Sequence, residues 1–158
     1  TCRRQRQMCI RDRFSTSDFA KSHPGGKLGK RLVTKVDDLM AKGKGLPIVD
    51  LKTTLSKTLI EVSSKGLGVA LVIENNLLKG IFTDGDLRRT LNEELDPLGK
   101  PISQFMTKNS KTILHNSLAI DALNIMQNNK IYSLAVLDEI KRPIGVIRMH
   151  DLIEAGLV

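Results

Sequence analysis

The 158-residue sequence contains no tryptophan, and aromatic residues make up only 3% of it. Its core must therefore be built from Leu, Ile, Val and Met. No apolar run approaches the roughly 20 residues that a membrane-spanning helix needs, and no secretory signal pattern is present. We therefore expect no membrane partner.

Cysteine is also scarce, with only Cys2 and Cys9, both near the N-terminus. Their spacing matches neither a set of metal ligands nor a disulfide framework. Because disulfide-rich domains are typical of secreted proteins, this usage favours a cytoplasmic protein. We expect no metal site.

The net charge of +8 arises from one segment. Residues 1–35 hold ten Lys or Arg and two Asp, whereas residues 36–158 hold fifteen charges of each sign. The basic segment has no interleaved aromatic residues and no recognised DNA-binding pattern, so we do not expect a nucleic-acid partner. Residues 1–13 lack helical or strand periodicity and are interpreted as a non-native or disordered leader.

The most informative stretch, residues 77–89, has a strand–turn–helix pattern. Residues 77–82 are mostly apolar and of strand length. Thr83 is predicted to cap the following helix, with Asp86 as the acidic partner of a capping box. Gly85 is expected to let another backbone or a ligand approach closely. Helix-start amides favour an anion and carboxylates favour hydroxyl groups, although the same residues also fit a capped helix without a ligand.

A second copy of this pattern occurs at residues 143–153. Gly80 and Gly145 are 65 residues apart, as are Asp86 and Asp151. Two further sets repeat at nearly the same spacing: Val36–Met40 with Ile102–Met106, and Leu59 and Val62 with Leu123 and Met126. A single unit of this size would struggle to bury its apolar face, so the two copies are expected to pack on each other.

Each copy is predicted to be a β-α-β-β-α unit, which makes the fold class α+β. The first unit has strands at 47–49, 69–73 and 77–82, and helices at 55–65 and 86–91. The second has strands at 112–113, 134–137 and 144–147, a helix over 118–126, and a last helix that includes residues 152–153. Met40 and Met106 are interpreted as core-filling residues.

Two such units, each ending in a turn from a glycine-containing strand into an Asp-bearing helix, resemble a tandem cystathionine-β-synthase (CBS) domain pair, also called a Bateman module. This resemblance implies two units packed with pseudo-two-fold symmetry. More narrowly, the sequences SHPGG at 22–26, GIFTDGDLRR at 80–89 and MHDLIEAG at 149–156 resemble the C-terminal half of bacterial D-arabinose 5-phosphate isomerases. That similarity covers roughly residues 14–158.

The resemblance implies a linker from a sugar-isomerase (SIS) domain at residues 14–35, a first CBS domain at 36–96 and a second at 97–158. The family enzyme interconverts D-ribulose 5-phosphate and D-arabinose 5-phosphate, for synthesis of the octulosonate of lipopolysaccharide or capsule. Most of its catalytic residues belong to the SIS domain, which does not occur in residues 1–158. Only the catalytic histidine maps here, onto His23, so we expect these residues alone to be inactive as an isomerase.

CBS pairs often hold a nucleotide in a cleft between their units. The resemblance therefore implies that Thr83 faces a phosphate and that Asp86 accepts hydrogen bonds from ribose hydroxyls. In the second turn Asp151 matches this pattern, but Arg148 replaces the hydroxyl residue and His150 precedes the aspartate. An arginine there suits a more acidic ligand, such as a nucleotide-activated sugar acid.

Asp84 adds negative charge to the first turn, which Arg148 or Lys111 is expected to offset. We expect no required cofactor, a nucleotide or nucleotide-sugar effector, and homo-oligomers formed through the CBS pairs. Two alternatives stay open: a freestanding CBS pair that senses nucleotides, and the regulatory half of a different enzyme. The identity of the effector and the sign of its regulation stay open as well.

Overall fold

The computed structural model describes residue 29 and residues 32–158. The predicted leader at 1–13, most of the predicted linker at 14–35, and His23 lie outside the described residues.

The described chain has nearly the same order of elements in its two halves, except that the 3-10 helix at Gly43–Gly45 in the first half has no counterpart in the second. Its first half contains α4 (Val36–Leu39), β1 (Ala41–Lys42), the 3-10 helix η1 (Gly43–Gly45), β2 (Ile48–Asp50), α5 (Leu55–Lys65), β3 (Val69–Glu74), β4 (Leu77–Thr83) and α6 (Asp84–Glu93). Its second half contains the 3-10 helix η2 (Ile102–Gln104), β5 (Thr107–Lys108), β6 (Thr112–Leu114), α7 (Ala119–Asn129), β7 (Ser133–Leu137), β8 (Pro143–Arg148) and α8 (Met149–Glu154). We call β2-α5-β3-β4-α6 the first unit and β6-α7-β7-β8-α8 the second unit. The predicted α+β class and β-α-β-β-α order are confirmed.

Local sequence signals account for where the long helices begin and end. The Thr54 side chain accepts a hydrogen bond from the Lys57 backbone N–H at 3.3 Å and so caps the start of α5. Gly66 ends that helix in the left-handed conformation, with φ of +71°. Lys130 adopts the same conformation after α7, with φ of +54°, which is less favourable for a residue that has a side chain.

The two sheets exchange their outer strands. One sheet has the order β2-β3-β4-β5 and the other β1-β8-β7-β6, so each unit's sheet receives a two-residue strand from the other half of the chain. β1 lies antiparallel to β8, with Ala41 opposite Val146. β5 lies antiparallel to β4, with Thr107 opposite Ile81. Strands this short have no readable periodicity, and the exchange was not predicted from the sequence.

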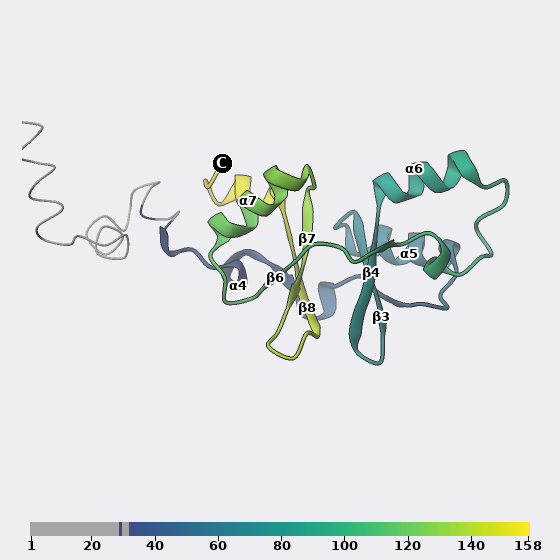
Figure 1. Cartoon of the computed structure of the whole chain (residues 1–158), viewed down its shortest axis with the longest axis horizontal. Coiled ribbons are helices and arrows are strands. Elements are labelled where there is room, and N and C mark those ends of the chain that lie inside the picture. The colour runs from purple at the N-terminus through teal and green to yellow at the C-terminus, as the bar shows by residue number, and fades with distance from the viewer. Residues whose placement is uncertain (1–28, 30–31) are drawn as a thin grey trace, which may run out of the picture.

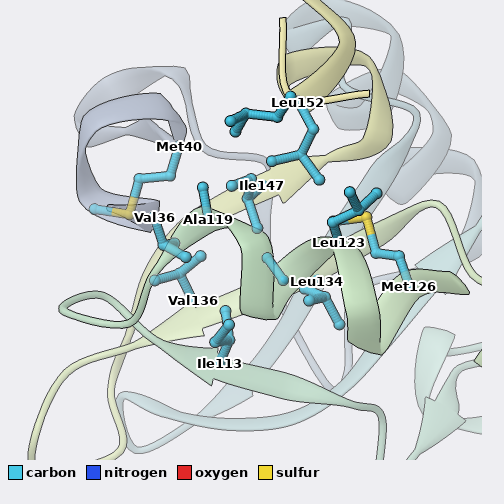
Figure 2. Close-up of a cluster of buried hydrophobic side chains, with 12 residues drawn as sticks. Val36, Met40, Ile113, Ala119, Leu123, Met126, Leu134, Val136, Ile147 and Leu152 are labelled. Carbon is cyan, nitrogen blue, oxygen red and sulfur yellow. The ribbon is translucent and has the colours of Figure 1, made fainter. Parts of the chain in front are cut away.

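The residues around the exchanged strands also fill the opposite core. Val36 and Met40 belong to the core of the second unit, where they pack with residues such as Ala119, Ile147 and Leu152 (Figure 2). Reciprocally, the core of the first unit includes Ile102, Phe105 and Met106. Met40 and Met106 therefore pack as core residues, as predicted. Met40 precedes the first unit in sequence but packs in the core of the second, and Met106 precedes the second unit but packs against the core of the first.

We call residues 36–42 and 102–108 the exchanged segments. Each contacts the opposite unit at a glycine. A Cβ atom at Gly80 would lie 2.7 Å from the Thr107 carbonyl oxygen and 2.8 Å from the Met106 sulfur. A Cβ at Gly145 would lie 2.5 Å from the Met40 sulfur. Another segment of the chain thus approaches closely at these two strand glycines. It does not do so at Gly85, where the nearest atom to a Cβ would be the Thr83 hydroxyl oxygen at 3.6 Å.

The two units face each other through their sheets. A third apolar cluster joins them, with Val69 and Leu71 from β3 packed with Ala135 from β7 and Val146 from β8. Figure 1 shows the β3–β4 and β7–β8 hairpins side by side with their turns at the same end, and the helices on the outer sides. The described chain is therefore one body with pseudo-two-fold symmetry. No helix in residues 32–158 is long and apolar enough to cross a bilayer.

Candidate functional site at the strand-to-helix turns

The first candidate turn joins β4 to α6 and is built around Asp86. Thr83 caps the helix, and the predicted capping box with Asp86 is present. One carboxylate oxygen of Asp86 accepts hydrogen bonds from the Thr83 backbone N–H at 2.9 Å and from the Thr83 hydroxyl at 3.1 Å. The Asp86 side chain is only 3% exposed. The helix begins here because the carboxylate satisfies an amide that has no partner within the helix.

The other carboxylate oxygen of Asp86 is bound by groups that were not identified from the sequence. It accepts a 2.7 Å hydrogen bond from the Thr107 hydroxyl, which belongs to the exchanged segment 102–108, and an ion-paired hydrogen bond from Arg89. The Thr90 hydroxyl in turn donates to the Asp86 carbonyl oxygen at 2.8 Å. Asp86 therefore ties α6, β4 and β5 together. A ligand hydroxyl could reach its carboxylate only by displacing one of these donors.

Arg89 is the donor most readily displaced, because its side chain is 66% exposed. A pocket of about 370 Å³ opens at this point between α6 and the exchanged segment. Asp86, Arg89 and Thr107 line it, together with Glu93 and Gln104. Phe105 and Met106 also line it, so its walls are mainly polar, with charges of both signs and an apolar part.

The second candidate turn joins β8 to α8 and uses a different arrangement. The Arg148 backbone N–H donates to Asp151 at 2.9 Å, which again forms a capping box. The Arg148 guanidinium also binds the Asp151 carboxylate, through Nε at 3.3 Å and a terminal nitrogen at 2.9 Å. The arginine predicted to bind a phosphate is thus paired with the aspartate of its own turn.

The exchanged strands make the two turns differ further. By the repeat, the residue of β1 that corresponds to Thr107 of β5 is Ala41, which has no hydroxyl. Asp151 therefore lacks the cross-unit hydrogen bond that Asp86 receives, and its side chain is 14% exposed. Among the residues that the structure describes, only the first turn is joined to the opposite half of the chain through its aspartate.

The remaining predicted site residues lie near these turns to different degrees. Asp84 is exposed at the first position of α6, and the described residues supply no hydrogen bond or ion pair to its side chain. His150 is exposed on α8 and pairs with Glu154 at 2.9 Å. Lys111 is exposed in the connection between β5 and β6. The structure therefore joins Thr83 with Asp86 and Arg148 with Asp151, and leaves Asp84, His150 and Lys111 outside those networks.

Two carboxyl groups on the hairpin between β7 and β8, those of Asp138 and Glu139, have lowered pKa values. Burial acts to raise the pKa of Asp138, but hydrogen bonds from the Arg142 backbone and guanidinium, its charge, and the Ile140 N–H outweigh it and lower the pKa. A 2.7 Å hydrogen bond with His115 lowers the pKa of Glu139. Both carboxylates are therefore held in their charged form by local partners.

The chemistry available at the turns is binding chemistry. Helix-start amides, hydroxyls and carboxylates gather there, and both aspartates are paired with arginine. Within residues 32–158, no three His, Cys, Asp or Glu side chains gather to hold a metal ion. These groups are able to form hydrogen bonds with a polar, hydroxyl-bearing molecule.

Comparison with known proteins places this fold and these turns in a family. The model of the CBS domain matches residues 36–93 and 102–157. The arabinose 5-phosphate isomerase KdsD of Pseudomonas aeruginosa is 50% identical over 146 residues, which cover 92% of this chain and 45% of that protein. The chain thus spans less than half the length of that curated relative.

Solved structures of CBS proteins share the fold. CBSX2 in complex with AMP superposes with a TM-score of 0.67 at 24% identity, over 78% of this chain and 96% of that chain. The CBS domain pair of MJ0100, in complex with 5'-methylthioadenosine and S-adenosyl-L-methionine, has a TM-score of 0.69 at 19% identity, over 77% of this chain and 94% of that chain. The resemblance inferred from the motifs is confirmed.

Proposed function

Because this chain belongs to the CBS domain family and forms a CBS pair homologous to KdsD, we propose that it is the regulatory ligand-binding and association module of an arabinose 5-phosphate isomerase. That enzyme would interconvert D-ribulose 5-phosphate and D-arabinose 5-phosphate for octulosonate synthesis, in lipopolysaccharide or capsule, in the cytoplasm. The observation that carries this proposal is the 50% identity to KdsD over nearly the whole chain.

Two other functions compete with this one: a freestanding nucleotide sensor and the regulatory half of a different enzyme. Both would use the same fold as the module proposed here. The three functions differ only in whether the CBS pair is joined to a catalytic domain, and to which one. Expression of the gene with its upstream reading frame distinguishes them. Turnover of D-arabinose 5-phosphate that changes when a nucleotide is added supports our proposal, and absence of that turnover contradicts it.

The ligand we propose is a nucleotide or nucleotide sugar bound at the turn of Thr83 and Asp86, between α6 and the exchanged segment 102–108 from the other half of the chain. Support comes from the helix-start amides and hydroxyl of that turn, from the polar pocket beside it, and from the nucleotide-type ligands of CBSX2 and MJ0100. A ribose hydroxyl would take the place of the exposed Arg89 on the Asp86 carboxylate. The freed guanidinium would then be available to a phosphate.

Calorimetric titration with nucleotides and nucleotide sugars tests this site. We expect modest affinity, with a dissociation constant of about 1 μM at best, or on the order of −8 kcal/mol, because Asp84 repels a phosphate. Asp86→Asn keeps the shape of the side chain but removes its charge, and should weaken binding about tenfold. Asp84→Asn is the matched control in the same turn and should leave binding unchanged or tighter.

Two results would contradict the site. One is that none of the nucleotides or nucleotide sugars binds the wild-type protein. The other is that Asp86→Asn, with its fold verified by circular dichroism, binds as tightly as wild type. Either result would mean that the turn acts only as a helix cap and does not bind a nucleotide.

We also propose that copies of the chain associate through the end of α6. Leu91 in that helix, and Leu95 and Leu98 in the connection that follows it, are apolar side chains that are 58%, 106% and 48% exposed. A two-fold axis at this end of the helix would set the leucines of one copy against the same leucines of the other, which is the self-complementarity that such an interface requires.

Sedimentation velocity measures this association. The wild-type protein should sediment as a dimer at micromolar concentration, and Leu95→Lys should shift it to the monomer because a lysine would be buried there without a partner. Leu114→Lys is the control, since Leu114 is 47% exposed on β6, away from α6. A monomeric wild-type protein, or a dimeric Leu95→Lys variant, would contradict the interface.

A further inference from the structure

A second pocket, of about 340 Å³, lies at the hairpin end of the molecule. It is lined by the first residues of β4, including Leu78 and Lys79, by Ser110 in the connection from β5 to β6, and by Ile140 and Lys141 in the β7–β8 turn. The turn at Thr83 is at the opposite end of β4, about 13–20 Å from the lining residues 77–79 at roughly 3.3 Å per residue. This pocket is therefore separate from the site proposed above.

Both units contribute walls to this pocket. Lys79 belongs to the first unit and Lys141 to the second, and Ser110 lies in the segment that connects them. Figure 1 shows the two hairpin turns at the same end of the molecule. Clefts between domains are common ligand sites, and this volume falls within the range of roughly 300–1,000 Å³ typical of them.

The charges in the pocket favour an anion. Over residues 32–158, no carboxylate lies within ion-pair distance of Lys79 or Lys141. Lys141 lies in the β7–β8 hairpin, whose acidic groups already have partners: Asp138 pairs with Arg142 at 3.0 Å and Glu139 with His115 at 2.7 Å. Two lysines that line the pocket, one from each unit, are thus left to attract negative charge.

The remaining lining is suited to an organic ligand. Leu77 and Ile140 are 40% and 61% exposed, and Leu78 and Leu137 extend this apolar surface. In the part of the chain that the structure describes, the Ser110 hydroxyl has no hydrogen-bond partner, so it can bind a ligand oxygen. We propose that this pocket binds a small organic phosphate whose flat apolar group lies on the leucines while its phosphate is held between Lys79 and Lys141.

The test is a nitrogen-15 NMR titration of the whole chain with 1-naphthyl phosphate, compared with 1-naphthol and inorganic phosphate. We expect 1-naphthyl phosphate to shift the amide signals of residues 77–79, 109–112 and 137–141, and to bind more tightly than either fragment. The double variant Lys79→Gln, Lys141→Gln should weaken that binding at least about tenfold, the loss expected for a charge-assisted contact. The control is Lys52→Gln, Lys57→Gln, which removes the same charge from exposed positions elsewhere on the first unit and should leave binding unchanged.

Three outcomes would overturn the inference. Shifts confined to residues 83–89 would assign all binding to the turn at Thr83 and leave the proposed function intact. Equal affinity for inorganic phosphate would show that the leucines contribute nothing. Equal weakening by both double variants would show that only net charge matters. By contrast, binding here that survives in Asp86→Asn would support a separate pocket.

Discussion

Replacement of Asp86 by alanine should lower the free energy of unfolding by about 3 kcal/mol. The buried carboxylate accepts hydrogen bonds from the Thr83 N–H and hydroxyl, the Thr107 hydroxyl and Arg89. Alanine would leave the Thr83 amide and the Thr107 hydroxyl without an acceptor, in addition to the loss of the helix cap. Urea denaturation followed by circular dichroism measures the change. The melting temperature should fall by about 6–12 °C.

Asp84→Ala is the matched control for this prediction. Asp84 lies in the same first turn of α6 but is exposed, so its removal should cost no more than about 1 kcal/mol through the helix dipole. Asp151→Ala should fall between the two, because Asp151 is less buried and lacks a counterpart of the Thr107 bond. Equal losses for Asp86→Ala and Asp84→Ala would contradict the network described here.

Gly80→Ala should destabilise the protein by a similar amount, about 3 kcal/mol. The new Cβ would lie 2.7 Å from a backbone carbonyl oxygen of the exchanged segment 102–108, and it could be accommodated only if β5 moved away from β4. Such a movement would also disturb the hydrogen bond from Thr107 to Asp86. Thermal and urea denaturation both report the loss.

Gly99→Ala is the control for the glycine prediction. A Cβ at Gly99 meets no atom within 4 Å and the backbone there is not left-handed, so alanine should be neutral or stabilise by about 0.4–1 kcal/mol through the unfolded state. If Gly80→Ala were as stable as Gly99→Ala, the close approach of β5 to β4 would not exist in solution.

Much of this architecture could be predicted because it is repeated. The spacing of 65 residues within the glycine pair and within the aspartate pair identified two units. An apolar run rich in β-branched residues predicted β3, and the apolar run in the second unit predicted β7. The capping box at Thr83 and Asp86 was also predicted correctly, because it depends on residues only three apart. Local signals and repeats were sufficient for these features.

The interactions that join the two halves could not be predicted in the same way. Ala41–Lys42 and Thr107–Lys108 are too short to have strand periodicity, so nothing in the sequence indicated which sheet they would join. For the same reason, the hydrogen bond that the Thr107 hydroxyl donates to Asp86 was not predicted. The close approach of segment 102–108 to Gly80 was missed too. At Gly85 the described residues bring no other segment within 4 Å of a Cβ, and the approach of a ligand there stays a prediction.

The exchange also gives the proposed function a physical basis. Asp86 holds residues of both halves of the chain, and the pocket at the opposite end is lined by both units. A ligand at either place would contact elements whose relative position depends on the exchanged segments. Binding could therefore change the arrangement of the two units, provided that they respond as one body.

Amide hydrogen exchange in Gly80→Ala, followed residue by residue by NMR, tests most directly whether the exchanged segments make the two units one cooperative body. The substitution lies in the first unit, in contact with segment 102–108. Our account predicts that protection falls together in β3, β4, β7 and β8. Loss of protection confined to β3 and β4, with β7 and β8 unchanged from wild type, would show that the units unfold independently and would contradict it.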